Sequence, residues 1–173
     1  MTVWTRQTIL RRASAADIPM IMEMERRPGY DLFVGRWDDA QHLRNISKSG
    51  YLYLVHDGSE GLPIAFAALS GLGHRDGDVL INRMIVRTPG TGTGKLFLRA
   101  IMSLAFEGAP TYRLWLRVLP DNLRALHVYR TQGFRDERVV PNGGVRSDGV
   151  RVDLLLMSIL REDWDARTDA LEF

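Results

Sequence analysis

A glycine-rich turn in the middle of the chain has the spacing of an anion-binding loop. The apolar run Met84-Ile85-Val86 is followed by Arg87-Thr88-Pro89-Gly90-Thr91-Gly92-Thr93-Gly94-Lys95 and then by a segment of helical periodicity. Glycines at alternate positions let the backbone take positive φ, and consecutive N–H groups at a helix N-terminus converge on one point. Phosphate is the anion that such an arrangement binds best.

The spacing separates three kinds of phosphate-binding loop. The Walker A loop requires G-x-x-x-x-G-K-[ST], but alignment on Gly94-Lys95 puts Pro89 at its first glycine and Leu96 at its hydroxyl residue. A magnesium-dependent nucleotidase is therefore disfavoured. The dinucleotide pattern G-x-G-x-x-G also fails, because the third glycine falls one residue early. A loop for the pyrophosphate of an acyl-CoA remains, together with a glycine turn that binds nothing.

A second motif decides between these two. The stretch from Asn122 to Phe134 reads N-x-x-A-x-x-x-Y-x-x-x-G-F, and together with the glycine loop it resembles the GNAT superfamily of N-acetyltransferases. The resemblance covers about Ile9 to Trp164 and is strongest to the branch of ribosomal-protein N-terminal and spermidine acetyltransferases. The family usually has Arg or Gln separated by two residues from its Gly-x-Gly, which in this register is Gly92-x-Gly94. This chain has Pro89 there, and Arg87 is the nearest basic side chain that can replace it.

The resemblance implies a fold and a cosubstrate. The fold is a mixed α+β domain with a mostly antiparallel sheet of about seven strands, a splayed parallel pair at its centre and about four flanking helices. The cosubstrate is acetyl-CoA, whose pantetheine arm enters the gap between the paired strands 78–86 and 111–119. The residues expected to bind the coenzyme are Ile85, Val86, Arg87, Gly90, Thr91, Gly92, Thr93, Gly94, Lys95, Asn122, Ala125 and Tyr129.

Direct attack of an amine on a thioester requires a base for the ammonium and an acid for the departing thiolate. Tyr129 is the candidate acid, since a phenol with a pKa near ~10 can protonate a thiolate. Packing of its ring under the sheet is the alternative. Asn122 is a candidate for contact with pantetheine or sulfur, and also for a helix cap. Asp78, the ionisable residue on its strand face, is the candidate base unless it is only a turn residue.

The acceptor pocket is expected between the first two helices, with Glu25, Tyr30, Phe33 and Trp37 as its residues. Asn82 joins them as a residue that can hold a proton-relaying water. Aromatic residues at this density are also common in plain packing. The acceptor is predicted to be a primary amine, on a peptide N-terminus, a polyamine or another small molecule. The competing hypothesis is a module that binds acyl-CoA without catalysis.

Periodicity predicts the elements that hold these residues in place. A helix is expected from Ser14 or Asp17 through Glu25, and another from Asp121 or Asn122 to Gly133. Further helices are expected at 37–48 and 93–107. The predicted strands are 8–12, 51–56, 62–70, 78–86, 111–119, 134–140 and 150–160, with a long loop at 141–149. A single domain is expected over 1–173, with its core at about 8–164 and a loose tail at 165–173.

Composition excludes several classes of protein. A chain of 173 residues with 45% hydrophobic and 25% charged residues is globular, and a net charge of +2 is too weak to indicate nucleic acid. Cysteine is absent, and the four histidines lack metal-ligand spacing, so no metal site is expected. No apolar run approaches ~18 residues, so we expect a soluble cytoplasmic protein without a membrane segment. The apolar run Leu154–Met157 indicates either a homodimer interface or a covered central strand.

Overall fold

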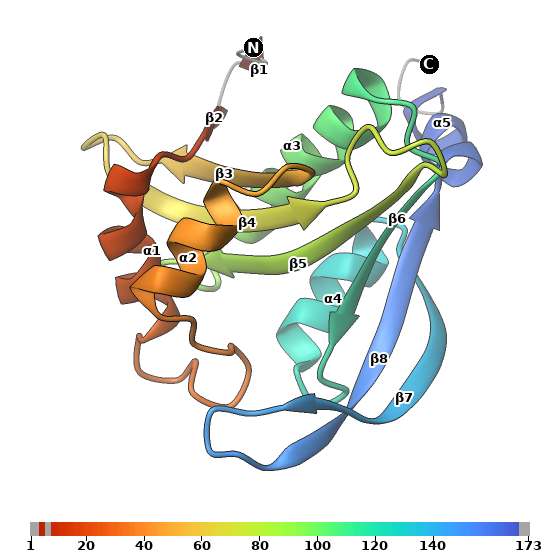
Figure 1. Cartoon of the computed structure of the whole chain (residues 1–173). Coiled ribbons are helices and arrows are strands. Elements are labelled where there is room, and N and C mark those ends of the chain that lie inside the picture. The colour runs from red at the N-terminus through yellow and green to blue at the C-terminus, as the bar shows by residue number, and fades with distance from the viewer. Residues whose placement is uncertain (1–3, 6–7, 170–173) are drawn as a thin grey trace.

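A mixed sheet forms the middle layer of the protein (Figure 1). The computed structural model describes residues 4–5 and 8–169, and its strand order is β1-β2-β3-β4-β5-β6-β8-β7. Every neighbouring pair is antiparallel except β5 and β6, which run parallel. The strands are β1 (Trp4–Thr5), β2 (Thr8–Arg12), β3 (Tyr51–Asp57), β4 (Pro63–Ser70), β5 (Asp78–Val86), β6 (Arg113–Val118), β7 (Arg135–Val145) and β8 (Arg151–Leu160).

Helices cover both faces of the sheet. Helices α1 (Ile18–Glu25) and α2 (Asp39–Ile46) lie in front of β3 to β5, while α3 (Thr93–Gly108) lies behind them (Figure 1). Helix α4 (Leu123–Thr131) packs on the same core cluster as α3. Helix α5 (Arg161–Asp169) follows β8 directly. The predicted mixed α+β fold is confirmed, with β1 and α5 as additions to it.

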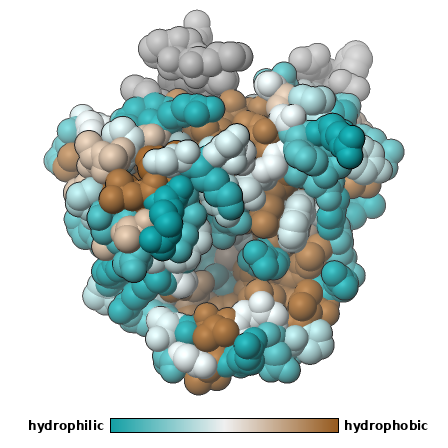
Figure 2. Space-filling view, in the orientation of Figure 1, coloured by the Kyte–Doolittle hydropathy of each residue, from teal (hydrophilic) through white to brown (hydrophobic). Residues whose placement is uncertain are grey.

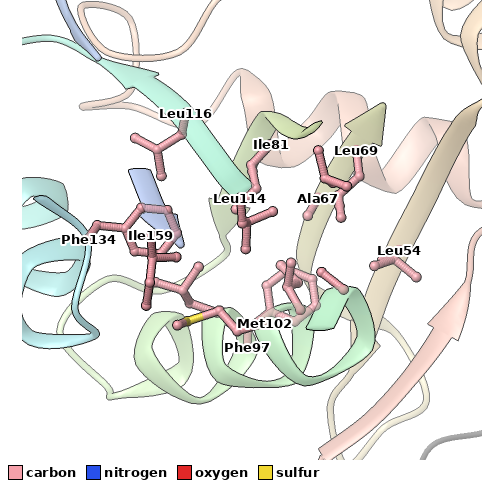
Figure 3. Packing of buried hydrophobic residues seen from close by; sticks show 14 of the residues in the cluster. Leu54, Ala67, Leu69, Ile81, Phe97, Met102, Leu114, Leu116, Phe134 and Ile159 are labelled. Carbon is pink, nitrogen blue, oxygen red and sulfur yellow. The ribbon is translucent and has the colours of Figure 1, made fainter. Parts of the chain in front are cut away.

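The central strands are buried on both faces, which explains why they read as nearly continuous apolar runs. In β3, Leu52 and Leu54 pack toward α3, while Tyr53 and Val55 pack toward α1. Figure 3 shows the α3 side, where Phe97 and Met102 of the helix lie against side chains of the sheet. Because both of their faces are covered, the central strands form a rigid frame for the residues at their ends.

A bulge in β5 breaks the alternation that the sequence suggested. Leu69 pairs with Ile81 and Ala68 pairs with Arg83, so Asn82 is an extra residue on β5. Strict alternation along β5 would place Asn82 and Met84 on one face with Asp78. Beyond the bulge, however, Met84 packs with the α3 cluster that also holds Ile81. The bulge therefore exchanges the faces of β5 halfway along the strand.

The position of strand β8 in the sheet accounts for the apolar run Leu154–Met157. It lies between β6 and β7, and five consecutive residues, 155–159, are buried within the chain. The run is therefore a covered central strand, and it gives no evidence for a homodimer. Among the described residues, no helix is long and apolar enough to cross a bilayer.

Several predicted boundaries need correction. Helix α2 begins at Asp39, because the Asp38 side chain caps it by accepting from the Gln41 N–H at 2.7 Å, so Trp37 lies outside the helix. Strand β7 continues to Val145 through an irregular register, which shortens the predicted 141–149 loop. Strand β8 begins at Arg151 rather than at residue 150. The tail predicted from residue 165 is helical to residue 169, and residues 170–173 lie outside the described part.

The contacts of α5 explain why it is ordered. Trp164 stacks on Phe106 of α3 with ring centroids 5.6 Å apart. The guanidinium of Arg161 donates to the carbonyl oxygens of Phe106, Ala109 and Thr111 at 2.8 to 3.0 Å. The segment is mostly polar, but Trp164 packs it on α3 and Arg161 binds the carbonyl groups at and after the end of α3.

Candidate functional site

Two cavities open where β5 and β6 separate. The ladder between these strands ends at the pair Ile81 and Leu116, directly before the bulge. The hairpin cavity, of about 380 Å³, lies between β5, β6, residues 31–35 and the β7–β8 hairpin. The loop cavity, of about 360 Å³, lies between β5, residues 29–34, the glycine loop and the start of α4. Figure 2 shows a hollow above the hairpin on this face of the molecule.

Tyr129 stands where the two cavities meet, because it lines both. Burial raises the pKa of Tyr129 to about 12, so its hydroxyl is protonated at neutral pH. The hydroxyl makes no hydrogen bond to any described residue, and the ring lies against Phe134 at a centroid distance of 5.8 Å. The site thus holds a proton donor that is held in place by packing rather than by a bond to its hydroxyl.

Asn122 and Ala125 also line both cavities. The side-chain oxygen of Asn122 accepts from the Ala125 N–H at 3.3 Å and so caps α4. Its side-chain nitrogen donates to no other described residue. The predicted cap is therefore confirmed, and one amide donor remains free at the junction of the cavities.

The glycine loop has the conformation that its composition predicts at two of its three glycines. Gly90 has φ +83° and Gly92 has φ +82°, while Gly94 lies in the first turn of α3 without positive φ. None of the N–H groups of residues 90–94 donates to another described residue. The Thr91 hydroxyl donates to the Thr88 carbonyl at 3.0 Å and lies 2.9 Å from the Thr93 hydroxyl. The turn is therefore held by the two threonine hydroxyls, and its five backbone N–H groups are available to a ligand.

The end of β5 departs from the predicted coenzyme contacts. Arg87 does not line either cavity: its N–H donates to the Ile64 carbonyl at 2.7 Å, and its guanidinium contacts Pro63 and Glu23. Its guanidinium is therefore held by β4 and α1 in this structure, and its role in place of the missing basic residue stays a prediction. Ile85 lines both cavities, and the Val86 carbonyl accepts the Tyr30 hydroxyl.

Asp78 lies outside the site. It pairs with Arg113 at 3.3 Å, at the start of β5, where the parallel ladder to β6 is intact. Neither cavity includes it. The expectation that it acts as the base is therefore not supported, because the gap opens at the other end of the strand.

The predicted acceptor residues divide into three groups. Phe33 lines both cavities, and Asn82 lines the hairpin cavity while its side-chain nitrogen donates to the Ser70 hydroxyl at 2.8 Å. Tyr30 lines only the loop cavity. Glu25 and Trp37 line neither cavity. They lie behind the hairpin cavity, where both contact Arg83.

Three basic residues line the hairpin cavity that the sequence did not indicate: Arg83, Arg117 and Arg146. Asp31 is the carboxylate that lines it. A signal for one of them exists in β6, where Arg113, Trp115 and Arg117 alternate with buried Leu114, Leu116 and Val118. The two outer arginines reveal a polar face on that strand. Arg83 had no such signal, since only the bulge turns it toward the cavity.

Charged residues also line the loop cavity, and the basic ones are suited to a phosphorylated ligand. Arg124 and Asp121 line this cavity together with Pro89 and Gly94 of the glycine loop. Lys95 is exposed in the first turn of α3, with its N–H donating to the Gly92 carbonyl. Among the described residues, no group of three metal-ligating side chains comes together.

Comparison with known proteins identifies the fold of this site. Residues 7–135 match the family described as acetyltransferase (GNAT) domain. The structure is similar to the ribosomal-protein-S18-alanine N-acetyltransferase of Escherichia coli, with a TM-score of 0.73 and 19% identity over 89% of this chain and 94% of that one. It is also similar to the spermidine N-acetyltransferase of Vibrio cholerae in complex with CoA and spermine, with a TM-score of 0.79 and 18% identity over 92% and 99%.

Proposed function

The chain belongs to the GNAT family of acetyltransferases, and from this premise we propose that it transfers the acetyl group of acetyl-CoA to a primary amine by direct attack. Tyr129 acts as the general acid in this proposal. The observation that carries it is the position of Tyr129 on the wall of both cavities, with its hydroxyl free and protonated. The loop cavity takes the coenzyme and the hairpin cavity takes the amine.

The loop cavity suits the coenzyme at both of its ends. The free N–H groups of residues 90–94 and the N-terminus of α3 form an anion site for the pyrophosphate. Beyond Ile81, β5 has no strand on its β6 side, so its backbone groups there are available to a pantetheine arm. The Tyr30 hydroxyl, which donates to the Val86 carbonyl, must give up that bond if the arm uses the same oxygen.

Acetyl-CoA supplies a thioester carbonyl at the junction of the cavities, and the protein supplies the proton that the leaving sulfur needs. Burial raises the pKa of Tyr129 to about 12, so its hydroxyl keeps its proton at neutral pH and can donate to the sulfur as negative charge develops there, and solvent restores any proton that it gives up. The donor therefore stays protonated until the thiolate forms. The free side-chain nitrogen of Asn122 is in place to hold the sulfur or the adjacent amide.

We propose that the proton of the acceptor ammonium leaves through water rather than to a carboxylate. Asp31 is the only carboxylate among the described lining residues of the hairpin cavity, and it is paired with Arg36. Asn82 donates through nitrogen to Ser70, so its carbonyl oxygen remains as an acceptor for such a water. Asn82 lines the hairpin cavity, which is the space that the acceptor and this water would share.

The acceptor class is a primary amine in this proposal. The similar proteins named above act on a ribosomal-protein alanine and on spermidine, which are both amines of very different size. The hairpin cavity is partly open to solvent, so either a small amine or a peptide terminus can enter it. Nucleic acid has no part in this proposal.

Mass spectrometry of acetylated products tests the proposal. The protein is incubated with acetyl-CoA and a panel of polyamines, amino acids, aminoglycosides and N-terminal peptides. We expect a product whose turnover falls by about 100- to 10,000-fold in Tyr129→Phe while the affinity for acetyl-CoA is kept. Tyr112→Phe is the matched control, since Tyr112 is 58% exposed and lines neither cavity. Binding of acetyl-CoA without any product favours a non-catalytic acyl-CoA-binding module instead.

A further inference from the structure

The charges of the hairpin cavity indicate what else the acceptor carries besides its amine. We infer that the acceptor bears an anionic group, a carboxylate or a phosphate, that binds Arg117. This inference rests on the proposed acetyl transfer and specifies its second substrate. It comes from the distribution of ion pairs around the cavity, where one guanidinium is left over and no carboxylate is.

Four charged side chains line the hairpin cavity among the described residues, and three of them already have partners. Arg83 pairs with Glu25 at 2.7 Å, and Arg146 pairs with Asp148 at 2.8 Å. Asp31 pairs with Arg36. The lining residues therefore carry three positive charges and one negative charge, and the negative one is neutralised.

Arg117 has no carboxylate partner among the described residues. It is exposed, and its guanidinium lies 5.9 Å from the centroid of the Trp115 ring. It is also the first residue of β6 beyond the last pair with β5, so it stands at the mouth of the gap. Arginine holds carboxylate and phosphate with two parallel hydrogen bonds, which makes it a specific anchor for either group.

Arg83 strengthens the preference without being free itself. Its guanidinium lies 3.7 Å from the centroid of the Trp37 ring, which fixes its position, and its Nε is buried without a hydrogen-bond partner. Its charge is compensated by Glu25 on the side away from the cavity. The cavity wall thus has two arginines on neighbouring strands, and its one lining carboxylate is already paired, so the excess of positive charge concentrates anionic ligands.

The same arrangement disfavours a polyamine. A polyamine needs a carboxylate for each ammonium that it does not acetylate, and here the single lining carboxylate is taken by Arg36. Spermidine would also bring positive charge next to Arg117. This chain therefore shares its fold with a spermidine acetyltransferase, while the charges of its own hairpin cavity favour an acceptor with an anionic group.

Matched pairs of amines test the inference. L-phenylalanine with phenethylamine differs by a carboxylate, phosphoethanolamine with ethanolamine differs by a phosphate, and spermidine serves as the polycation. Turnover of each amine is measured with acetyl-CoA, and its binding to the complex of protein and CoA is measured by calorimetry. The variants are Arg117→Gln, the charge reversal Arg117→Glu, and Arg12→Gln as a control that removes an exposed charge from β2, four strands away from β6.

We expect kcat/KM to be at least about ten-fold higher for the anionic member of one pair, and this ratio to vanish in Arg117→Gln but not in Arg12→Gln. Arg117→Glu should reverse the ratio. Preference for spermidine or the neutral members, or a ratio unchanged in Arg117→Gln, overturns the inference. If no amine is acetylated although acetyl-CoA binds, the transfer proposal fails. The calorimetric ratio then decides, since Arg117-dependent binding of the anionic members sustains the inference and equal binding rejects it.

Discussion

The carboxylate of Glu25, at the end of α1, lies 2.7 Å from the guanidinium of Arg83, which follows the bulge in β5. Glu25 is fully buried, and the ring of His42 in α2 approaches its second oxygen at 3.2 Å. The ring of Trp37 packs on Arg83, and the backbone N–H of Trp37 donates to Glu25 Oε2 at 3.4 Å. Two helices and the segment between them therefore converge on one residue of the cavity wall.

Replacement of Glu25 by Gln should harm both stability and the acceptor cavity. Burial lowers the pKa of Arg83, and the negative charge of Glu25 opposes that shift, so the variant leaves a buried cation without compensation. We expect a loss of about 3 kcal/mol in the free energy of unfolding. We also expect a raised KM for the acceptor, with the affinity for acetyl-CoA kept. Urea denaturation and steady-state kinetics measure the two effects.

Glu23→Gln is the matched control for this experiment. Glu23 lies on the same helix, but it is exposed and contacts Arg87 at 3.3 Å rather than a residue of the site. Its replacement should change the free energy of unfolding by less than about 0.5 kcal/mol. An equal loss in both variants would show that the charge of α1, rather than the buried pair, is responsible.

Gly92→Ala should weaken the binding of acetyl-CoA. Gly92 caps α3 with φ +82°, a conformation that costs an alanine about 1 to 2 kcal/mol, although open space surrounds the position where its Cβ would lie. The strain is relieved by a change in the loop, which displaces the free N–H groups of residues 90–94. Calorimetry with acetyl-CoA should show at least a ten-fold weaker Kd, at roughly that cost in free energy.

Gly94→Ala separates loop strain from the mere addition of a methyl group. Gly94 has no positive φ, and a Cβ there would meet Val86 Cγ1 at 3.6 Å, which is an ordinary contact. Because the residue lies in the first turn of α3, alanine should raise the free energy of unfolding by up to about 0.5 kcal/mol. A loss of stability in this variant equal to that of Gly92→Ala contradicts the assignment of the strain to φ.

The pH dependence of the reaction should show no ionisation of Tyr129 in the ordinary alkaline range. Desolvation holds its pKa at about 12, above the ordinary value near ~10, so the acid keeps its proton. We expect kcat to rise with pH as the acceptor ammonium loses its proton. We expect no decrease of kcat at any pH up to about 10.5. Profiles with two acceptors of different amine pKa separate the acceptor from the enzyme, and a falling limb near pH 8 to 9 in both would remove Tyr129 from the role.

The same shift has a consequence for stability with a definite sign. The folded-state pKa of Tyr129 is raised above the unfolded value, so its contribution to folding is complete below about pH 10 and is lost as the pH rises toward 12. Tyr129→Phe removes this dependence. Alkaline denaturation of the two proteins therefore provides a readout that is independent of turnover.

The sequence predicted the parts of the site that local chemistry determines. Gly90 and Gly92 have positive φ because only glycine does so at low cost, and Asn122 caps α4 because a short amide side chain reaches the N–H of Ala125. Both conclusions needed only neighbours in the chain. The roles of these residues toward coenzyme and acceptor stay predictions.

The parts that failed depend on contacts between distant segments. Asp78 lies outside the site, because the bulge at Asn82 and the end of the ladder at Ile81 place the gap at the other end of β5. Glu25 was expected at the acceptor and instead holds Arg83, which is 58 residues away in the chain. A pattern of alternating residues contains neither a bulge nor a partner at that distance, so these positions required the structure.

Helix α5 gives a last test, because its polar sequence suggested a tail. Trp164 is its anchor: the ring stacks on Phe106 with 17° between the ring planes, and the cluster behind Phe106 includes Ile159 and the core of α3. Trp164→Ala should lower the free energy of unfolding by about 2 to 3 kcal/mol, less than the loss in a fully enclosed core because the indole is partly exposed. Glu162→Ala, at an exposed position of the same helix, should cost less than about 0.5 kcal/mol. Because no described residue of α5 lines either cavity, kcat of the folded fraction should be unchanged, and a variant that loses turnover without losing stability would show that the helix acts on the site.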